Sequence, residues 1–296
     1  KRELDARVEF QKEPAMEGQD AQLTETITNN KWLFLPLLQV GFHIHRNLWF
    51  ADGENTSVSD QCYKRDIFSV GSYQRITRTI PFHCRKRGYY ELDKVELVTR
   101  SPLMTQKHYE TLSHPDHFYV YPSLVDERQL EIPFQKVMGS VLLLDVEDET
   151  IWKYDEIHEE GIRIAASLIS RCIQSGIPVG VRTNGRDQKT GECFHLEVGS
   201  GRQQVRLANE GLSRIDLVQK PDKMEFVLTR ERESMDHTYR TYVMISKNQR
   251  ISCYEGFKEL LHQGAGGIWI ATLYKEMNMT LPMDSDLSVI RWEVKK

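Results

Sequence analysis

Roughly the first 122 residues are predicted to form short strands separated by turns. Apolar and polar side chains alternate from Gln22 to Thr28, where Leu23 and Ile27 share one face and an Asn-Asn pair closes the segment. Further segments are rich in β-branched or aromatic residues and are bounded by Gly, Asn, Asp or Pro: 37–45, 63–70, 74–84, 89–99 and 117–121. A run of strands without helices predicts an immunoglobulin-like β-sandwich.

The pattern changes after Pro122. A continuous apolar run from Val141 to Leu144 ends at Asp145, which is typical of a strand covered on both faces of a parallel sheet. A helical period follows from residue 155 and stops at Gly176, and the next strand is predicted at 177–181. Strand, helix and strand at this spacing predict a right-handed βαβ unit.

The same alternation continues along the rest of the chain. Strands are predicted at 193–198, 239–246 and 268–273, helices at 203–215, 222–233 and 254–262, and a helix stop at 264–267. An open, doubly wound α/β domain is therefore predicted for 141–296, after a β-sandwich over 1–125 and a linker over 126–140.

Length and composition agree with two globular domains. The chain has 296 residues, of which 40% are hydrophobic and 28% charged. Its net charge of −4 comes from 39 basic and 43 acidic residues spread over the whole length. Because no positive field is concentrated anywhere, nucleic-acid binding is not expected.

The five cysteines form no CxxC pair, so neither a disulfide framework nor a zinc site is indicated. A reducing compartment fits this usage, although Cys62 and Cys84 are predicted on neighbouring strands and could pair in an oxidising one. No stretch approaches a spanning helix, since the best candidate, residues 32–40, is interrupted by Pro36. The chain opens with Lys-Arg and no Met, which leaves a signal or anchor upstream open.

Several short motifs resemble a bacterial family known as domain of unknown function 58. They are the segments 86–92 (KRGYYEL), 101–103 (SPL), 119–122 (YVYP), 142–145 (LLLD) and 165–168 (AASL). The resemblance implies a β-sandwich followed by a von Willebrand factor A-like domain. It further implies a membrane-anchored protein whose A-like domain meets a MoxR-type AAA+ ATPase or an envelope-assembly partner at the cytoplasmic face.

One departure from that family lies before the α/β domain. A family stretch resembling R-x-Y-x-x-x-D-x-x-R-x-I-x-W-K would be expected between Pro133 and Val141, and it is not present. In the family, this stretch would lie next to Gly139 and Ser140.

The resemblance also implies a divalent cation held by an Asp-x-Ser-x-Ser loop after the first strand, since hard oxygen ligands suit magnesium or calcium. Here Asp145 is kept, but Glu147 and Glu149 replace both serines, and Ser246-Lys247-Asn248 stands where a later Asp is expected. Because Lys247 could offset the extra charge, we expect a degenerate, water-facing acidic loop with no metal and no cofactor. A metal, if bound, would use Asp145 and Glu147.

Other candidate chemistry is weaker. His43 and His45 share a strand face, but the sequence places no third zinc ligand nearby. Gly199-Ser200-Gly201 precedes a helix and could cradle an anion, yet it lacks the Lys-Ser/Thr ending of a P-loop. No nucleophile elbow or cysteine signature is present to support nucleophilic catalysis.

Polar residues at strand ends predict a binding rim at the carboxyl edge of the sheet, where open α/β sheets form their crevice. Its members are Asp145, Glu147, Glu149, Thr183, Asn184, Ser200 and Ser246. The main hypothesis is a non-catalytic protein–protein interaction or scaffolding module, with a partner that brings Lys or Arg to the crowded carboxylates. The alternative is a metal-dependent hydrolase that uses the acidic loop.

Overall fold

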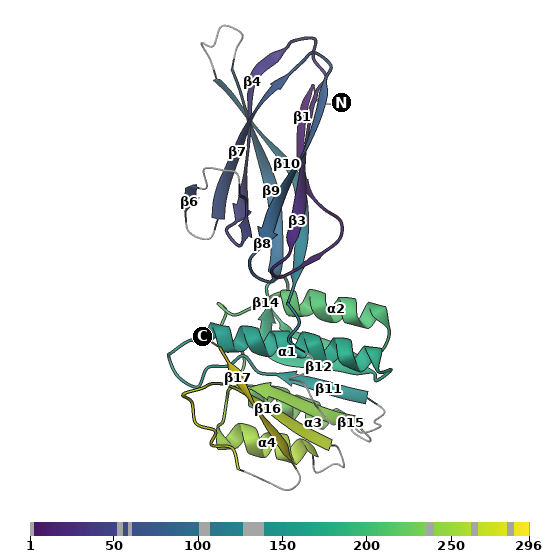
Figure 1. Ribbon diagram of the computed structural model, residues 1–296, viewed down its shortest axis with the longest axis vertical. Coiled ribbons are helices and arrows are strands. Elements are labelled where there is room, and N and C mark those ends of the chain that lie inside the picture. The colour runs from purple at the N-terminus through teal and green to yellow at the C-terminus, as the bar shows by residue number, and fades with distance from the viewer. Residues whose placement is uncertain are drawn as a thin grey trace. The chain divides into compact units, whose positions relative to one another are not determined.

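The computed structural model describes residues 3–51, 56–58, 61–100, 107–126, 139–234, 240–261, 266–282 and 287–295. The chain divides into two compact units, Lys1–Tyr121 and Pro122–Lys296 (Figure 1). This boundary precedes the predicted one, because Val125 packs against the core of the second unit and its N–H donates to Ser167 Oγ at 2.9 Å. Residues 122–125, predicted as the end of the sandwich, therefore belong to the second unit, and so do Gly139 and Ser140 of the predicted linker, which begin its first strand.

Some predicted features lie outside the described residues. These are the SPL motif at 101–103, most of the linker (127–138), Tyr239, His262 at the end of the predicted helix 254–262, and the first half of the predicted helix stop (264–265).

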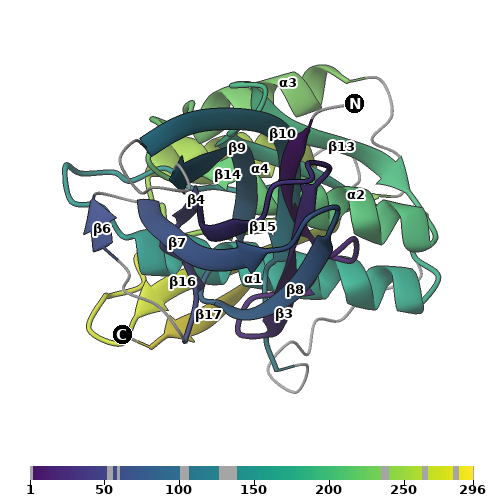
Figure 2. The same ribbon diagram turned by 90° about the horizontal axis from the view of Figure 1, so that it is seen from above.

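The first unit is a β-sandwich of two curled sheets, as predicted. One sheet has the order β1 (Leu4–Phe10), β3 (Asp20–Asn29), β8 (Arg75–Cys84) and β5 (Leu48–Trp49). The other has the order β2 (Ala15–Met16), β10 (Lys107–Tyr121), β9 (Gly88–Arg100), β4 (Leu35–His45), β7 (Gln61–Val70) and β6 (Thr56–Val58). All pairings are antiparallel except β2 with β10, and the ribbons curve around a shared interior in Figure 2.

Alternating side chains fill the interior of the sandwich. Phe10, Phe82 and Phe118 meet there, with ring centroids between 5.3 and 6.0 Å apart. Cys62 and Cys84 do not lie on neighbouring strands, because β7 and β8 belong to different sheets, and both cysteines are free. That prediction was wrong, since strands consecutive in a sandwich often cross from one sheet to the other.

The second unit is built on one sheet with helices on both faces. Its order is β13 (Cys193–Gly199), β12 (Val179–Asp187), β11 (Gly139–Leu144), β15 (Arg240–Ser246), β16 (Gly266–Tyr274) and β17 (Ser288–Val294), and the short β14 (Ile215–Asp216) pairs with β12. Strands β12, β11, β15, β16 and β17 pair parallel with their neighbours in that order. Strands β13 and β14 both pair antiparallel with β12.

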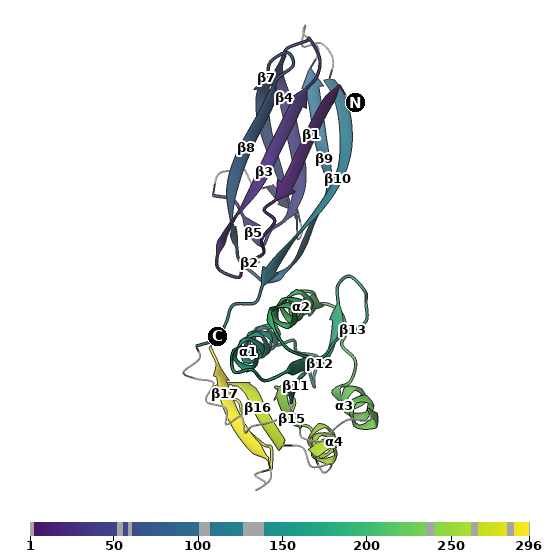
Figure 3. The same ribbon diagram turned by 90° about the vertical axis from the view of Figure 1, so that its right-hand side faces the viewer.

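Helices α1 (Asp155–Gln174) and α2 (Arg202–Ser213) cover one face, and α3 (Met224–Glu233) and α4 (Ile251–Leu261) cover the other (Figure 3). Along β11, Leu142 and Leu144 face the core of α1 while Val141 and Leu143 face the core of α3 and α4, and all four are fully buried. The prediction of a strand covered on both faces of a parallel sheet is therefore confirmed, and β11 lies between β12 and β15. No helix among the described residues has both the length and the apolarity needed to cross a membrane.

Candidate functional site

Asp145 is the centre of the carboxyl edge of this sheet. It follows Leu144, the last residue of β11, and is buried. Asn184 Nδ2 and the Glu147 N–H donate to its Oδ1 at 2.6 and 2.9 Å, and Ser246 Oγ donates to its Oδ2 at 2.7 Å. Burial raises the pKa of Asp145, and these hydrogen bonds offset only part of the rise. One carboxyl group thus joins the ends of three parallel strands.

A second layer of hydrogen bonds fixes the loops around Asp145. Asn184 Oδ1 accepts from the Val146 N–H at 2.9 Å, and Ser246 Oγ accepts from the Asn248 N–H at 2.8 Å. Asn248 Oδ1 in turn accepts from the Arg250 N–H at 3.0 Å. Because the side chains of Asn184, Asn248 and Ser246 are buried, these hydrogen bonds hold the edge of the sheet in one arrangement.

Arg250 neutralises the first of the two glutamates that replace serines. Its Nη2 lies 2.5 Å from Glu147 Oε2 and 3.5 Å from Glu225 Oε2. The same Glu147 oxygen accepts from the N–H of Met224, the first residue of α3, at 3.4 Å. Glu147 is mostly buried, so the expectation of a water-facing loop was wrong at this position.

Asp148 is held by a histidine and a lysine. His158 Nε2 lies 2.9 Å from its Oδ1, and Lys247 Nζ lies 3.4 Å from the same oxygen. The Lys247 ammonium also sits 4.7 Å from the centre of the Tyr154 ring. Partial burial alone would raise the pKa of Asp148, but His158 and Lys247 outweigh it and hold that pKa below its ordinary value. The predicted role of Lys247 as an internal counter-charge agrees with this geometry.

Glu149 and Thr183, two further residues of the predicted rim, differ in their exposure to solvent. Glu149 is exposed, and its Oε1 accepts from the Gln249 N–H at 2.7 Å. Thr183 pairs in register with Leu144, one position before the edge, and its buried Oγ1 accepts from the Gly185 N–H at 3.0 Å. Glu149 therefore belongs to the accessible rim, whereas Thr183 lies beneath it.

Ser200 does not belong to this edge, and its predicted place was wrong. Strand β13 runs antiparallel, so Gly199 pairs with Val179 at the amino end of β12. The predicted anion cradle is a turn in which Gly201 has a φ of 84° and the Gln204 side chain donates to the Val179 carbonyl at 2.7 Å.

The side chains at this edge do not fit the divalent cation that the family resemblance implies. Within the described ranges, no group of three or more His, Cys, Asp and Glu is placed to hold a metal ion. Glu147 is bound by Arg250 and Asp148 by Lys247, so a cation here would face two positive side chains. The hydrolase hypothesis therefore gains no support from the arrangement of its own residues.

The predicted histidine pair is also occupied by ordinary contacts. His43 is exposed and its ring lies 4.9 Å from that of Tyr63. His45 Nδ1 accepts from the Asn47 N–H at 3.2 Å.

We expect magnesium and calcium to leave the melting temperature of the protein unchanged, because the described residues offer no vacant set of oxygen ligands at the edge. A metal at 100 times its Kd would add about 2.7 kcal/mol and raise Tm by several degrees. Differential scanning fluorimetry with each chloride salt measures this, with sodium chloride at equal ionic strength as the control. A saturable rise in Tm that Asp145→Asn abolishes would contradict the expectation.

A groove of about 920 Å³ runs beside the acidic loop. It lies between the β11–α1 loop and the segment that precedes α3, and exposed apolar side chains line it. Ile151 is 93% exposed, Val218 82% and Phe226 64%, and Trp152 next to Ile151 is 69% exposed. Large apolar side chains gathered at this exposure mark interaction sites. The sequence pattern did not reveal these side chains as a group, because the fold brings them together from two loops and helix α3.

Lysines surround the same groove. Lys153 Nζ lies 3.5 Å from the Leu217 carbonyl oxygen and 3.4 Å from that of Val218, which links the two sides. Lys220 and Lys223 are exposed on the opposite loop. None of the three lysines forms an ion pair with a carboxylate in the described part of the chain.

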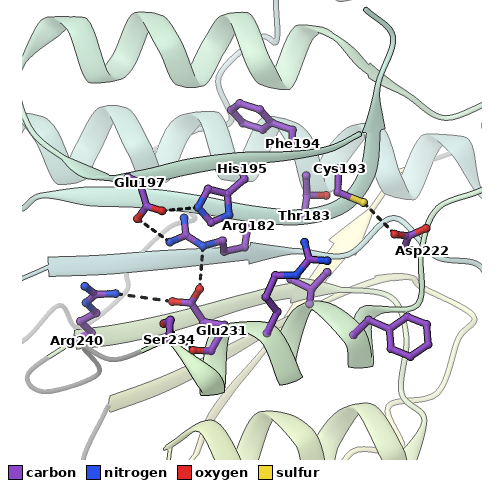
Figure 4. Close-up of a pocket in the computed structure, with 13 residues that line it drawn as sticks. Arg182, Thr183, Cys193, Phe194, His195, Glu197, Asp222, Glu231, Ser234 and Arg240 are labelled. Carbon is purple, nitrogen blue, oxygen red and sulfur yellow. Dashed lines mark hydrogen bonds and ion pairs between the residues drawn. The ribbon is translucent and has the colours of Figure 1, made fainter. Parts of the chain in front are cut away.

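A second pocket, of about 240 Å³, lies between β12, β13 and α3 (Figure 4). Arg182 Nε donates to Glu231 Oε2 at 2.8 Å, and its Nη2 donates to Glu197 Oε2 at 3.0 Å. Glu197 also lies 2.6 Å from His195 Nε2, and Arg240 approaches Glu231 at 3.8 Å. Since these groups satisfy one another, the network is a structural feature of the pocket floor.

Comparison with known proteins assigns no family. No family model matches the chain, and no curated protein matches it. Solved structures with weak similarity include a CARDB domain from Pyrococcus furiosus (16% identity, 40% of this chain and 86% of that chain, TM-score 0.26). Others are a PapD-like domain of human CEP192 (11%, 40% and 84%, 0.25) and a cohesin from Archaeoglobus fulgidus (10%, 39% and 90%, 0.27). TM-scores this low support no inference about family or function.

Proposed function

We propose that the chain is a non-catalytic interaction protein whose second domain holds a protein partner in the groove beside its acidic loop. The observation that carries this proposal is the group of three apolar side chains, Ile151, Val218 and Phe226, each at least 64% exposed around one groove. Interfaces obtain most of their affinity from a few such anchors that become desolvated on binding.

The rim beside the groove is suited to binding because it is already ordered. Asp145 ties three strand ends together, and Arg250 holds the acidic loop against α3. A partner that docks here would not have to order these loops, and the entropy cost of association is correspondingly smaller.

The charges around the groove select a partner with apolar and acidic side chains. Among the described residues, Lys153, Lys220 and Lys223 line it without an ion-paired carboxylate. Of the four carboxylates in the lining, Glu147, Asp148 and Asp222 pair with Arg250, Lys247 and Arg186, which leaves the exposed Asp155 against three lysines. The sequence analysis expected the partner to supply Lys or Arg, because the crowded carboxylates would repel one another. Arg250 and Lys247 already relieve that repulsion, so this expectation has lost its basis. Electrostatic complementarity instead favours carboxylates on the partner.

The domain architecture supports a more specific proposal. A parallel sheet with one antiparallel edge strand, helices on both faces and an Asp after the central strand supports assignment as a von Willebrand factor A-like domain. The two-sheet unit likewise supports an immunoglobulin-like sandwich. By the family resemblance, the partner is a MoxR-type AAA+ ATPase, and the full-length protein is anchored in a membrane with both domains at the cytoplasmic face.

Replacing Val218 or Phe226 with Asp tests the groove. Each change should weaken binding of the purified MoxR-type ATPase at least about tenfold, because it removes an anchor worth about 2 kcal/mol and adds a charge that repels acidic groups. Biolayer interferometry measures the affinity. Ile251→Asp is the matched control, since Ile251 is 66% exposed on α4 and does not line the groove. Equal losses in all three variants, or full binding in all three, would contradict the proposal.

A further inference from the structure

Three aromatic side chains project from one end of the β-sandwich. Trp32 is 75% exposed and Phe34 51% exposed in the connection between β3 and β4, and Tyr73 is 72% exposed in the turn between β7 and β8. Both connections lie at the same end of the sandwich (Figure 3). We call Trp32, Phe34 and Tyr73 the aromatic tip.

Hydrogen bonds join the two loops that carry the aromatic tip. The buried Asn29 donates from Nδ2 to the carbonyls of Leu33 at 2.8 Å and Gly71 at 2.9 Å. The Tyr73 N–H donates to the Lys31 carbonyl at 3.0 Å, and Ser72 Oγ donates to the Trp32 carbonyl. The aromatic side chains are therefore held on a single ordered platform, even though they are exposed to water.

Tyr73 has a φ of 52°, and among the described residues it is the one residue other than glycine with a positive φ. This left-handed conformation disfavours bulky side chains, and Gly or Asn would normally occupy such a turn position. An aromatic ring is thus kept at a backbone cost, in a place where it packs against no core. Strain of this kind at an exposed position points to a role for the side chain itself.

We propose that the aromatic tip inserts into the headgroup region of a lipid bilayer. Trp and Tyr rings are apolar with one polar edge, and such rings concentrate at membrane–water interfaces. Trp32, Phe34 and Tyr73 line neither of the two pockets described above, and at 51–75% exposure they project from their loops. Exposed Arg75 and half-buried Lys31 flank them, and both can meet lipid phosphates. Lys31 Nζ lies 3.3 Å from Oε2 of the exposed Glu3. Solvent screens this ion pair, so it holds Lys31 only weakly.

Co-sedimentation of the full chain with vesicles of phosphatidylcholine and phosphatidylserine tests this inference. The wild type should partition into the vesicle pellet, and Trp32→Ser should lower the partition coefficient about tenfold, because burial of one large apolar side chain contributes about 1.5 kcal/mol or more. Trp152→Ser is the matched control, since Trp152 is 69% exposed in the second domain and should be neutral.

Tyr73→Gly separates loss of contact from loss of folding. Glycine accepts the positive φ without strain, so this variant should melt at a higher temperature than the wild type while its vesicle binding falls. Absence of wild-type binding to these vesicles would overturn the inference, as would equal losses in Trp32→Ser and Trp152→Ser. If Trp32→Ser weakens binding to the ATPase and leaves vesicle binding unchanged, the aromatic tip is a protein contact and the inference fails. Val218→Asp should not alter vesicle binding, so the groove proposal stands or falls separately.

Discussion

Glu25→Gln is expected to stabilise the sandwich by up to about 3 kcal/mol at pH 8 and to change little at pH 4. Glu25 lies on β3 between Leu23 and Ile27 and on the same buried face. Its own side chain is only 1% exposed. Within the described residues, neither of its carboxylate oxygens has a hydrogen-bond partner. An ionised carboxylate in such a place is costly, whereas the neutral amide of Gln carries no charge to desolvate.

The surroundings of Glu25 explain the size of the effect. Burial and the nearby Asp66 raise its pKa, Arg78 and Lys64 oppose the rise, and the net effect is a pKa of about 7 instead of 4.5. Lys64 and Arg78 both pair with Asp66, at 3.5 and 3.2 Å, and so compensate that carboxylate first. Glu25 is left as the less compensated member of the cluster.

The direction of the pH dependence follows from proton binding. Between pH 4.5 and about 7 the folded state holds a proton on Glu25 that the unfolded state has released. Stability contributed by the protonated form is therefore fully present below pH 4.5 and is lost as pH rises to about 7. Ionising Glu25 at a pKa of about 7 in place of 4.5 costs the folded state about 3 kcal/mol, which sets the size of the expected effect.

Denaturant unfolding at several pH values measures this prediction, with hydrogen exchange of β3 and β8 peptides to isolate the transition of the sandwich. Glu91→Gln, an exposed glutamate on β9, serves as the control and should leave the pH profile as it is. The prediction fails if Glu25→Gln shows the same loss of stability between pH 5 and 8 as the wild type.

The sequence was most informative where one physical rule decided the structure. A run of four apolar residues at 141–144 has to be covered on both faces, so its central place and the edge position of Asp145 followed. Parallel neighbours end at the same edge, which brought Asn184 and Ser246 to Asp145. The period of two also places Glu25 on the same face as Leu23 and Ile27, so its burial was readable from the pattern.

Other features depend on information that a local pattern does not carry. The direction of β13 decided the place of Ser200, and the only local signal was a connection at 188–192 that is too short for a parallel crossover. Strand β1 was missed although Leu4, Ala6, Val8 and Phe10 alternate strictly. The pairing of Arg250 with Glu147 joins residues 103 positions apart, and no periodicity indicates such a contact.

Arg182→Met is expected to lower the free energy of unfolding of the second domain by about 3–5 kcal/mol, because it removes one partner of a buried ion pair. Both Arg182 and Glu231 are buried, and their side chains meet at 2.8 Å on the pocket floor. Without the guanidinium, Glu231 keeps the Tyr242 hydroxyl at 3.2 Å and Arg240 at 3.8 Å. The Leu196 carbonyl, which accepts from Arg182 Nη1 at 2.6 Å, also loses its donor.

A second variant separates the cost of a stranded charge from the net value of the pair. Replacing both residues, as Arg182→Met with Glu231→Leu, should recover most of the stability, because no uncompensated charge stays buried.

Arg206→Met is the matched control, since Arg206 and Glu210 meet at a similar 2.7 Å while the arginine is largely exposed. Solvent screens that pair, so its loss should cost less than about 1 kcal/mol in the same urea titration. If Arg182→Met costs no more than Arg206→Met, the pocket network does not stabilise the domain. If the double variant is no more stable than the single one, the cost arises from lost packing and not from the stranded Glu231 carboxylate.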